Sequence, residues 1–400
     1  MLPPRLIRRL LLVPLVVVIA AALAALTPTV ALLSAAFNLI RRRTGPGRAH
    51  RSRAARVAFL ALAWSAGETA ALTVLLGLWI ASGFGGRLDT EPYRARHYGV
   101  MRWFLDLVYR AAERACGLRV DVTGPPDAGL TGDRPLIVLS RHAGPGDSLL
   151  LARHLLSVCG RRPRVVMKAT LQLDPSVDIV ANRVPNAFLR RTAAGTTRRG
   201  HRRQHTEQIR RLAAGLDRDS ALLLFPEGGN WTPLRWRRAI DRLRRRGHDE
   251  LADRAAAMPN LLPPREGGAF AALAACPDAD VVFVAHTGLD RLVSVRDVWR
   301  SLLTDVEVRA RWWRVPAADV PRSADHATRV MWLYDWWARV DAWITEENTA
   351  ATGMPQRLGE SAPLTPRTRC GGGLRGVVPR DSRPNGSSRL LNPPGPVPSR

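Results

Sequence analysis

An uncharged apolar stretch near the N-terminus narrows the environments that this chain can occupy. Residues 10–40 carry no charge, follow Arg5, Arg8 and Arg9, and end at a run of arginines. The apolar core of a secretory signal has only about 7–15 residues, whereas about 20 apolar residues cross the core of a bilayer. The length therefore favours a membrane anchor over a signal peptide.

A second apolar stretch, residues 57–84, is interrupted by Gly67–Glu68. All three flanks of the two stretches are rich in arginine, and such flanks favour the cytoplasm. Two simple spans would place the arginine-rich loop 41–56 on the opposite side from the other two flanks. Pro14, Pro28 and the Gly67–Glu68 pair can each break a helix. We therefore predict shallow hairpins or interfacial helices that keep every arginine cluster on the cytoplasmic face of the cell membrane.

The charge balance favours anionic partners. The formal net charge is +26, and Lys168 is the only lysine, so arginine supplies nearly all of the positive charge. Phospholipid head groups and nucleic acid both suit such a chain. No nucleic-acid recognition motif accompanies the arginine runs, so we expect a phospholipid membrane and no nucleic acid. The four cysteines form no CxxC pair, and the spacing of cysteine and histidine predicts no metal site.

Beyond residue 89 the pattern becomes an alternation of strands and helices. Helical periodicity is clearest at 148–158, 204–216 and 239–257. Short strands are predicted at residues 118–122, 136–140, 164–167, 221–225 and 280–285. This alternation predicts an α/β fold with a largely parallel sheet flanked by helices.

The chain therefore divides into three predicted parts. Residues 1–88 are membrane-anchoring apolar helices, and residues 89–350 are the α/β domain. Residues 351–400, rich in Pro, Gly, Ser and Arg, are predicted to be disordered. Near the end of the α/β domain, Trp332, Trp336, Val340 and Trp343 form one helical stripe. Core packing and membrane contact both explain such a stripe, and core packing is the commoner of the two.

Two motifs stand at the ends of predicted strands. The strand 136–140 leads into an HxxxxD motif, in which His142 and Asp147 are separated by a turn rich in glycine. Asp147 lies where a helix begins, and folding back it would orient the imidazole as a base. The strand 221–225 ends in Phe-Pro-Glu-Gly, which brings Glu227 and Gly228 onto a turn whose backbone N–H groups suit an anion. Either motif alone is compatible with an ordinary turn.

Together, and in this order, the motifs resemble the glycerophosphate and lysophospholipid acyltransferase superfamily, specifically its lysophosphatidic acid acyltransferase branch. Phe188 and Arg191 match that family's second motif, although Pro185 replaces a glycine. Lys168 and Leu171 match a pattern that precedes this motif in some members. The fourth motif is matched only loosely, by residues 281–284. The resemblance spans about residues 100–290.

The resemblance implies a reaction and a set of roles. His142 would be the catalytic base and Asp147 its partner. Lys168, Phe188, Arg191, Glu227 and Gly228 would bind the acceptor, and the acyl group would come from acyl-CoA or acyl carrier protein without a further cofactor.

One departure from the family pattern concerns the acceptor. The third motif of the family usually continues Thr-Arg, where this chain has Gly229-Asn230. Arg235 or Arg237 could replace the missing arginine. The alternatives that remain open are 1-acylglycerol-3-phosphate, another lysolipid or glycolipid acceptor, and a non-catalytic arginine-rich scaffold that binds anionic lipid.

Overall fold

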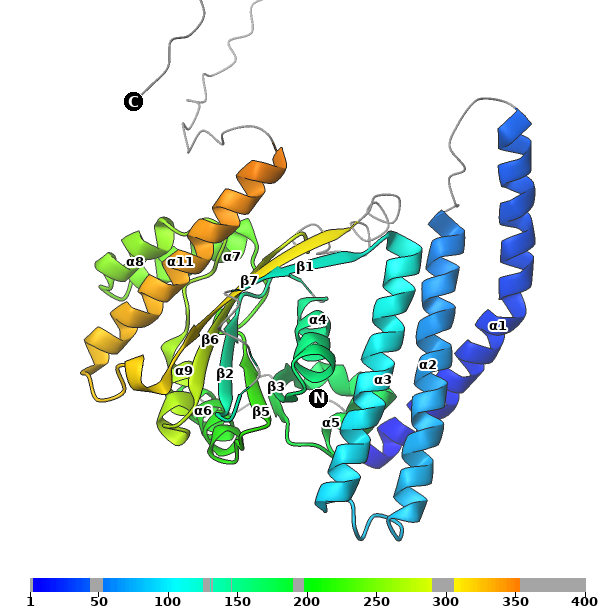
Figure 1. Cartoon of the computed structure of the whole chain (residues 1–400), viewed down its shortest axis with the longest axis horizontal. Helices are drawn as coiled ribbons and strands as arrows, with labels where there is room; N and C mark the ends of the chain where they lie inside the picture. The colour runs from blue at the N-terminus through cyan, green and yellow to red at the C-terminus, as the bar shows by residue number, and fades with distance from the viewer. Residues whose placement is uncertain are drawn as a thin grey trace, which may run out of the picture. The chain divides into compact units, whose positions relative to one another are not determined.

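The computed structural model describes residues 3–43, 53–124, 130, 132–144, 146–189, 198–289 and 306–352 (Figure 1). The α/β domain is built on a seven-stranded sheet with the order β1-β7-β6-β2-β5-β3-β4. The strands are β1 (Arg119–Thr123), β2 (Leu136–Ser140), β3 (Arg162–Lys168), β4 (Ala187–Leu189), β5 (Ser220–Leu224), β6 (Asp280–Thr287) and β7 (Glu307–Val315). All five predicted strands are confirmed, while β4 and β7 were not predicted.

The sheet is largely parallel, as expected. Neighbouring strands from β6 to β4 run in the same direction, and only β7 is antiparallel to β6. The carboxyl ends of β6, β2, β5, β3 and β4 therefore meet at one edge of the sheet, which we call the carboxyl edge.

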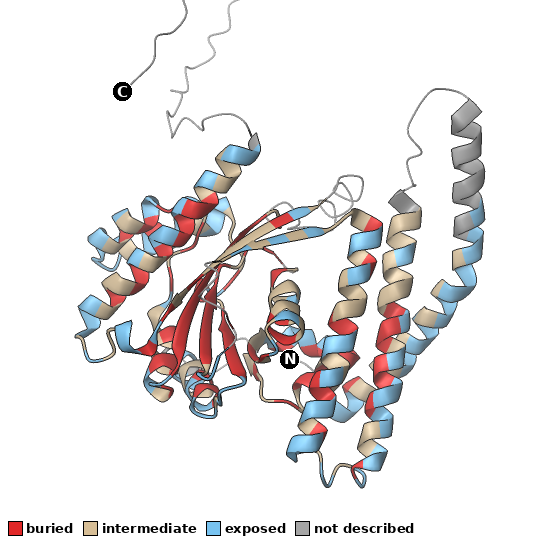
Figure 2. Ribbon diagram, viewed as in Figure 1, coloured by how far each residue is buried: buried red, intermediate tan, exposed pale blue. Residues whose placement is uncertain are grey.

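The central strands are buried on both faces. Every residue of β2, β5 and β6 is buried, as the red arrows in Figure 2 show. Because side chains alternate along a strand, Ile137 and Leu139 join one core cluster, while Leu136 and Val138 join another. The first cluster includes side chains from α6 (Arg198–Ala214), α9 (Glu266–Ala275) and α11 (His326–Thr352). The second includes the π-turn η1 (His154–Val158), which follows α4 (Asp147–Arg153).

The tryptophan stripe of α11 belongs to the core. Trp336 stacks on Phe283 of β6 with ring centroids 4.9 Å apart, and Trp332 meets the same ring edge-on. Trp343 is buried in the same cluster. The stripe therefore serves to hold α11 on the sheet.

The predicted helix 239–257 is wrong as a single element. Two helices, α7 (Pro233–Arg244) and α8 (Asp249–Ala256), occupy this region. Gly247 separates them with a φ of 71°, which a residue inside a right-handed helix cannot adopt. Further short elements are η2 (Ala169–Leu173), α5 (Pro175–Ala181) and η3 (Ala317–Asp319).

The N-terminal apolar stretches form long helices without a return. They lie in α1 (Arg5–Arg43) and α2 (Arg53–Ala81), which α3 (Glu91–Cys116) follows. Pro14 and Pro28 lie inside α1, and α2 continues through Gly67–Glu68, so hairpins broken at these positions are a wrong prediction. A proline removes one backbone hydrogen bond, and long apolar helices tolerate that loss.

Two of these segments are long and apolar enough to cross a membrane. They are Arg5–Thr29 and Ala55–Ala81. In the apolar 18-residue stretch of the first segment no residue is buried, and in that of the second segment 28% of the residues are buried. Exposure of the first segment distinguishes it from a core helix of a water-soluble domain. The position of the arginine clusters relative to a membrane stays a prediction, and the predicted tail, residue 353 onward, lies outside the described residues.

A buried carboxylate ties the start of α1 to the α/β domain. Asp178 of α5 accepts hydrogen bonds from Arg8 Nη2 at 2.6 Å and from Arg9 Nε at 2.7 Å. The side chain of Asp178 is 1% exposed, and that of Arg8 is 6% exposed. The arginines before the apolar stretch thus have a structural partner in the domain.

Replacing Asp178 with asparagine should destabilise the protein by about 3 kcal/mol or more, because breaking a buried ion pair leaves uncompensated charge. Thermal unfolding of the detergent-solubilised chain measures this effect. The matched control is Asp335→Asn, which breaks the exposed Arg254–Asp335 pair and should cost less than about 1 kcal/mol. Equal losses in the two variants would contradict the role assigned to Asp178.

Candidate active site

His142 and Asp147 meet at the carboxyl edge of the sheet. His142 follows β2, and its Nδ1 lies 2.9 Å from Oδ2 of Asp147, the first residue of α4. The same carboxylate accepts the backbone N–H groups of Ala143, Gly144 and Ser148 at 2.8, 3.1 and 2.6 Å. The glycine-containing turn thus closes around Asp147, which is buried, and leaves the His142 side chain 14% exposed.

The environment keeps Asp147 ionised. Burial raises its pKa, but the hydrogen bond and charge of His142, the charge of His286 and the Gly144 N–H lower it, and the net pKa lies below the usual value. The carboxylate therefore fixes Nδ1 of the imidazole and stabilises an imidazolium. Within the described part of the chain, no residue hydrogen-bonds Nε2 of His142, so this nitrogen can act as a base.

The Phe-Pro-Glu-Gly turn supports His142 from its other side. Glu227 Oε1 accepts the backbone N–H of His142 at 2.8 Å, and Oε2 accepts the N–H of Leu262 at 3.0 Å. Trp231 donates its backbone N–H to the carbonyl oxygen of His142, and the Phe225 ring lies 4.5 Å from the imidazole. Both oxygens of Glu227 therefore bind backbone of the protein, so this carboxylate positions His142.

A buried polar network, which the motifs did not reveal, underlies this arrangement. Arg141 is 2% exposed and donates from Nη1 to the carbonyl oxygen of His286 at 2.6 Å and from Nη2 to that of Asn260 at 3.3 Å. Nε2 of His286 lies 3.2 Å from the Arg141 carbonyl oxygen and 3.8 Å from Asp147 Oδ2. An arginine directly after a mostly apolar strand was the one sequence signal for this network.

Burial raises the pKa of two carboxyl groups near Arg141. The pKa of Glu227 rises to about 8, although hydrogen bonds from His142 and Leu262 and the charge of Arg141 oppose the shift. The pKa of Asp341, which accepts the Asn260 N–H at 2.8 Å, rises to about 6 for the same reason. The charge of the buried Arg141 opposes both shifts and so limits the cost of burying the two carboxyl groups.

The other predicted site residues are spread along the same edge. Lys168 is exposed at the end of β3, and Phe188 is half-buried in β4, which pairs with β3 through Lys168 and Leu189. Gly228 is exposed on the turn that follows β5, four residues after Leu224. Arg191 lies outside the described residues, as does Pro145 of the first motif.

An arginine that the sequence did not single out lies over Gly228. Gly228 has a φ of 68°, and a Cβ built there would lie 2.6 Å from Nη1 of Arg265. Gly229 likewise leaves space for Arg235, whose Nη1 donates to the Asn230 carbonyl oxygen at 3.0 Å. The two glycines therefore let guanidinium groups lie directly on the turn.

Four arginines form what we call the arginine cluster: Arg202, Arg235, Arg242 and Arg265. Exclusion of water and the charges of Arg242, Arg202 and Arg235 lower the pKa of Arg265. Among the described residues, none of the four pairs with a carboxylate. Because like charges repel, the cluster favours an anion beside the Gly228–Gly229 turn.

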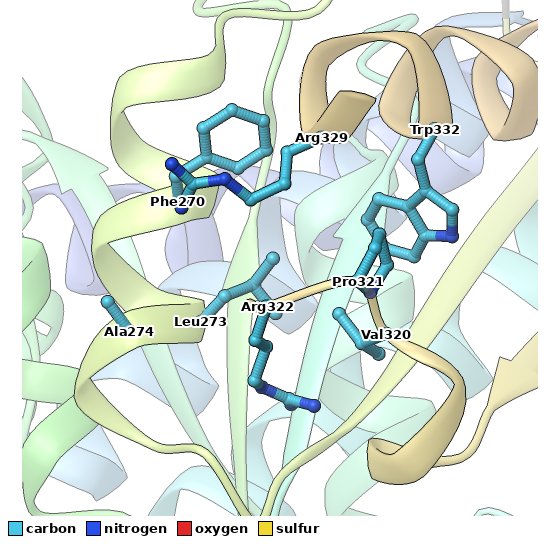
Figure 3. Close-up of a pocket in the computed structure, with 8 residues that line it drawn as sticks. All are labelled: Phe270, Leu273, Ala274, Val320, Pro321, Arg322, Arg329 and Trp332. Carbon is cyan, nitrogen blue, oxygen red and sulfur yellow. The ribbon is translucent and has the colours of Figure 1, made fainter. Parts of the chain in front are cut away.

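One cavity lies away from these residues. It has a volume of about 40 Å³ and is lined by α9, α11 and the segment around Arg322 (Figure 3). Arg322 donates from Nη2 to the carbonyl oxygen of Ala279, which precedes β6, so the cavity lies at the opposite edge of the sheet. It has room for about one water molecule. The described residues also contain no group of three potential metal ligands.

A family model covers the part of the chain that contains the His142–Asp147 and Phe-Pro-Glu-Gly motifs. Residues 119–287 match the family model described as Acyltransferase, and no curated protein matches the chain. Among solved structures, the chain is similar to the 1-acyl-sn-glycerophosphate (LPA) acyltransferase PlsC from Thermotoga maritima. The TM-score is 0.41 at 14% identity, and the match covers 71% of this chain and 99% of that chain. Residues 119–287, which contain His142, Asp147 and the Glu227–Gly228 turn, therefore form an acyltransferase domain.

Proposed function

We propose that this acyltransferase transfers a fatty acyl group to the free hydroxyl of a 1-acylglycerol-3-phosphate unit. The observation that carries the proposal is the His142–Asp147 pair, in which a buried carboxylate holds Nδ1 at 2.9 Å. Membranes that contain the chain, supplied with labelled acyl-CoA and lysophosphatidic acid, should form labelled diacyl product. Absence of product with every lysophospholipid acceptor would overturn the proposal.

The geometry supports direct transfer without an acyl-enzyme. Nε2 of His142 removes the proton from the acceptor hydroxyl as its oxygen attacks the thioester carbonyl carbon. The carbon–sulfur bond then breaks, and the imidazolium returns the proton to the thiolate. Asp147 stabilises the imidazolium between these two steps. Acyl-CoA or acyl carrier protein is the proposed donor, and no cofactor takes part.

The arginine cluster supports a phosphorylated acceptor. The chain has Gly229-Asn230 where the family usually has Thr-Arg, and Arg265 and Arg235 lie on this turn. Guanidinium groups bind phosphate oxygens in a bidentate manner. We assign the acceptor phosphate to this position, with Lys168 at the end of β3 as a further cation.

The exposed α1 supports attachment to the membrane. We place the α/β domain on the cytoplasmic side of the cell membrane, because the arginines at the start of α1 bind Asp178 of that domain. The carboxyl edge would then receive its acceptor from the adjacent leaflet.

Replacing Arg265 with glutamine should raise KM for lysophosphatidic acid about tenfold, which corresponds to the loss of one charge-assisted hydrogen bond. Activity on monoacylglycerol, which lacks the phosphate, should stay unchanged. Arg238→Gln is the matched control, because Arg238 is a neighbouring exposed arginine outside the cluster. Steady-state kinetics with both acceptors make the comparison, and equal losses on the two acceptors would refute the phosphate role.

A further inference from the structure

A second cavity, of about 490 Å³, opens between the start of α1, the end of α5, β4 and α6. We call it the amide cavity. Its polar side chains are five amides, two arginines and one histidine: Arg5, Gln172, Asn182, Asn186, Gln204, His205, Gln208 and Arg211. The described lining contains no carboxylate.

The three glutamines of the amide cavity have unused hydrogen-bonding groups. Gln172 is buried, and Oε1 of Gln208 is buried without a hydrogen-bond donor. No described residue hydrogen-bonds the side chain of Gln172, Gln204 or Gln208. By contrast, Asn186 uses its side chain for the fold, accepting the Val165 N–H at 2.7 Å. The glutamines are thus available to a ligand.

The chemistry of the lining selects the ligand class. An amide offers both a donor and acceptors, and a hydroxyl does the same, so a row of amides complements a polyol or a sugar. A carboxylate or phosphate alone would leave the glutamine carbonyl oxygens without donors. Phe188 adds an apolar surface to the same cavity, which suits the C–H groups of a ring.

The order of the strands relates the amide cavity to the reaction. Along the carboxyl edge, β2 carries His142, β5 carries Gly228 with Arg265 above it, β3 carries Lys168, and β4 borders the amide cavity. Three strand spacings separate β2 from β4, or about 14 Å. In an acceptor that ends at its phosphate, the phosphate lies too close to the reacting hydroxyl for the molecule to reach from β2 to β4. A head group that continues beyond the phosphate can do so.

We propose that the amide cavity binds a polyhydroxylated head group, such as an inositol or sugar ring, joined to the phosphate of the lysophospholipid acceptor. The inference rests on the proposed acyl transfer at His142. The reacting hydroxyl would lie at β2, the phosphate at the arginine cluster, and the ring among the glutamines of η2 and α6. Lysophosphatidic acid then represents only the inner part of the preferred acceptor.

Acceptor competition tests this assignment. Full-length protein in membranes receives acyl-CoA with lysophosphatidylinositol or lysophosphatidic acid. We expect kcat/KM to be at least about tenfold higher for lysophosphatidylinositol, and Gln208→Leu to lower that value roughly three- to tenfold. Gln208→Leu should leave kcat/KM for lysophosphatidic acid unchanged. Arg203→Gln, an exposed position on α6 outside the lining, is the control and should change neither value.

Two further outcomes keep the inference separate from the proposed function. Equal turnover of both acceptors by the wild type, or an equal loss on both in Gln208→Leu, would overturn the head-group assignment. If no acceptor is turned over, the proposed function fails, and binding decides the inference. Equilibrium dialysis of glycerophosphoinositol against His142→Ala protein should then show binding that Gln208→Leu weakens, and absence of binding would overturn the inference.

Discussion

Replacing His142 with alanine should reduce acyl transfer by a factor of about 10²–10⁴, the usual contribution of a positioned general base. The variant should fold and associate with membranes as the wild type does, because the imidazole is not part of the core. Asp147→Ala should cause a similar loss, since the carboxylate fixes Nδ1 of the ring at 2.9 Å. Thin-layer analysis of labelled product, at matched protein levels, measures both variants.

The control for this experiment is His248→Ala, because His248 is an exposed histidine next to α8. It should retain wild-type activity. Turnover by His142→Ala at the wild-type rate would eliminate His142 as the base, and the mechanism with it.

Replacing Glu227 with glutamine should both destabilise the domain and lower activity. The carboxyl oxygens accept the N–H groups of His142 and Leu262 at 2.8 and 3.0 Å. A glutamine would turn an NH₂ group toward one of these donors, and an unsatisfied buried donor costs about 1–3 kcal/mol. Denaturant unfolding should show this loss, and kcat should fall because the backbone of His142 is displaced.

The same variant tests the ionisation of Glu227. In the folded protein its pKa is about 8, compared with an ordinary value of 4.5. The unfolded chain therefore loses the proton first, so stability from this group is full below pH 4.5 and declines as the pH rises to about 8. The free energy of unfolding of the wild type should fall across this window relative to that of Glu227→Gln. A difference between the two proteins that stays constant from pH 4.5 to 8 would contradict the raised pKa.

The fold was predictable where the residue types of a segment indicate on their own that it is buried. The apolar runs within β2, β5 and β6 predicted buried parallel strands. Two other strands gave no such signal, because β4 has only three residues and β7 carries three arginines. Arg314 is neutralised by Asp280 at 2.6 Å and Arg309 by Glu347 at 2.9 Å. Those carboxylates are distant in the sequence, so the pattern of β7 alone could not indicate a strand.

The site residues were likewise predictable only where the sequence itself brings them close together. His142 and Asp147 lie on one short turn, so their pairing could be predicted from the chain itself. The support of His142 by Glu227 joins residues 85 positions apart, and the resemblance to a family indicated the pair without its geometry. Arg141 and Arg265 were missed, because their roles depend on which strands and helices come together in space.

The position of β2 in the sheet has a consequence for biosynthesis. Its two neighbours, β5 and β6, are made much later than β2 itself. Until residues 220–224 and then 280–287 emerge from the ribosome, the backbone groups on both sides of the apolar strand β2 remain unpaired. Such a strand is prone to wrong pairing. The nascent chain should therefore depend on a chaperone, or on early docking at the bilayer, from the time β2 appears.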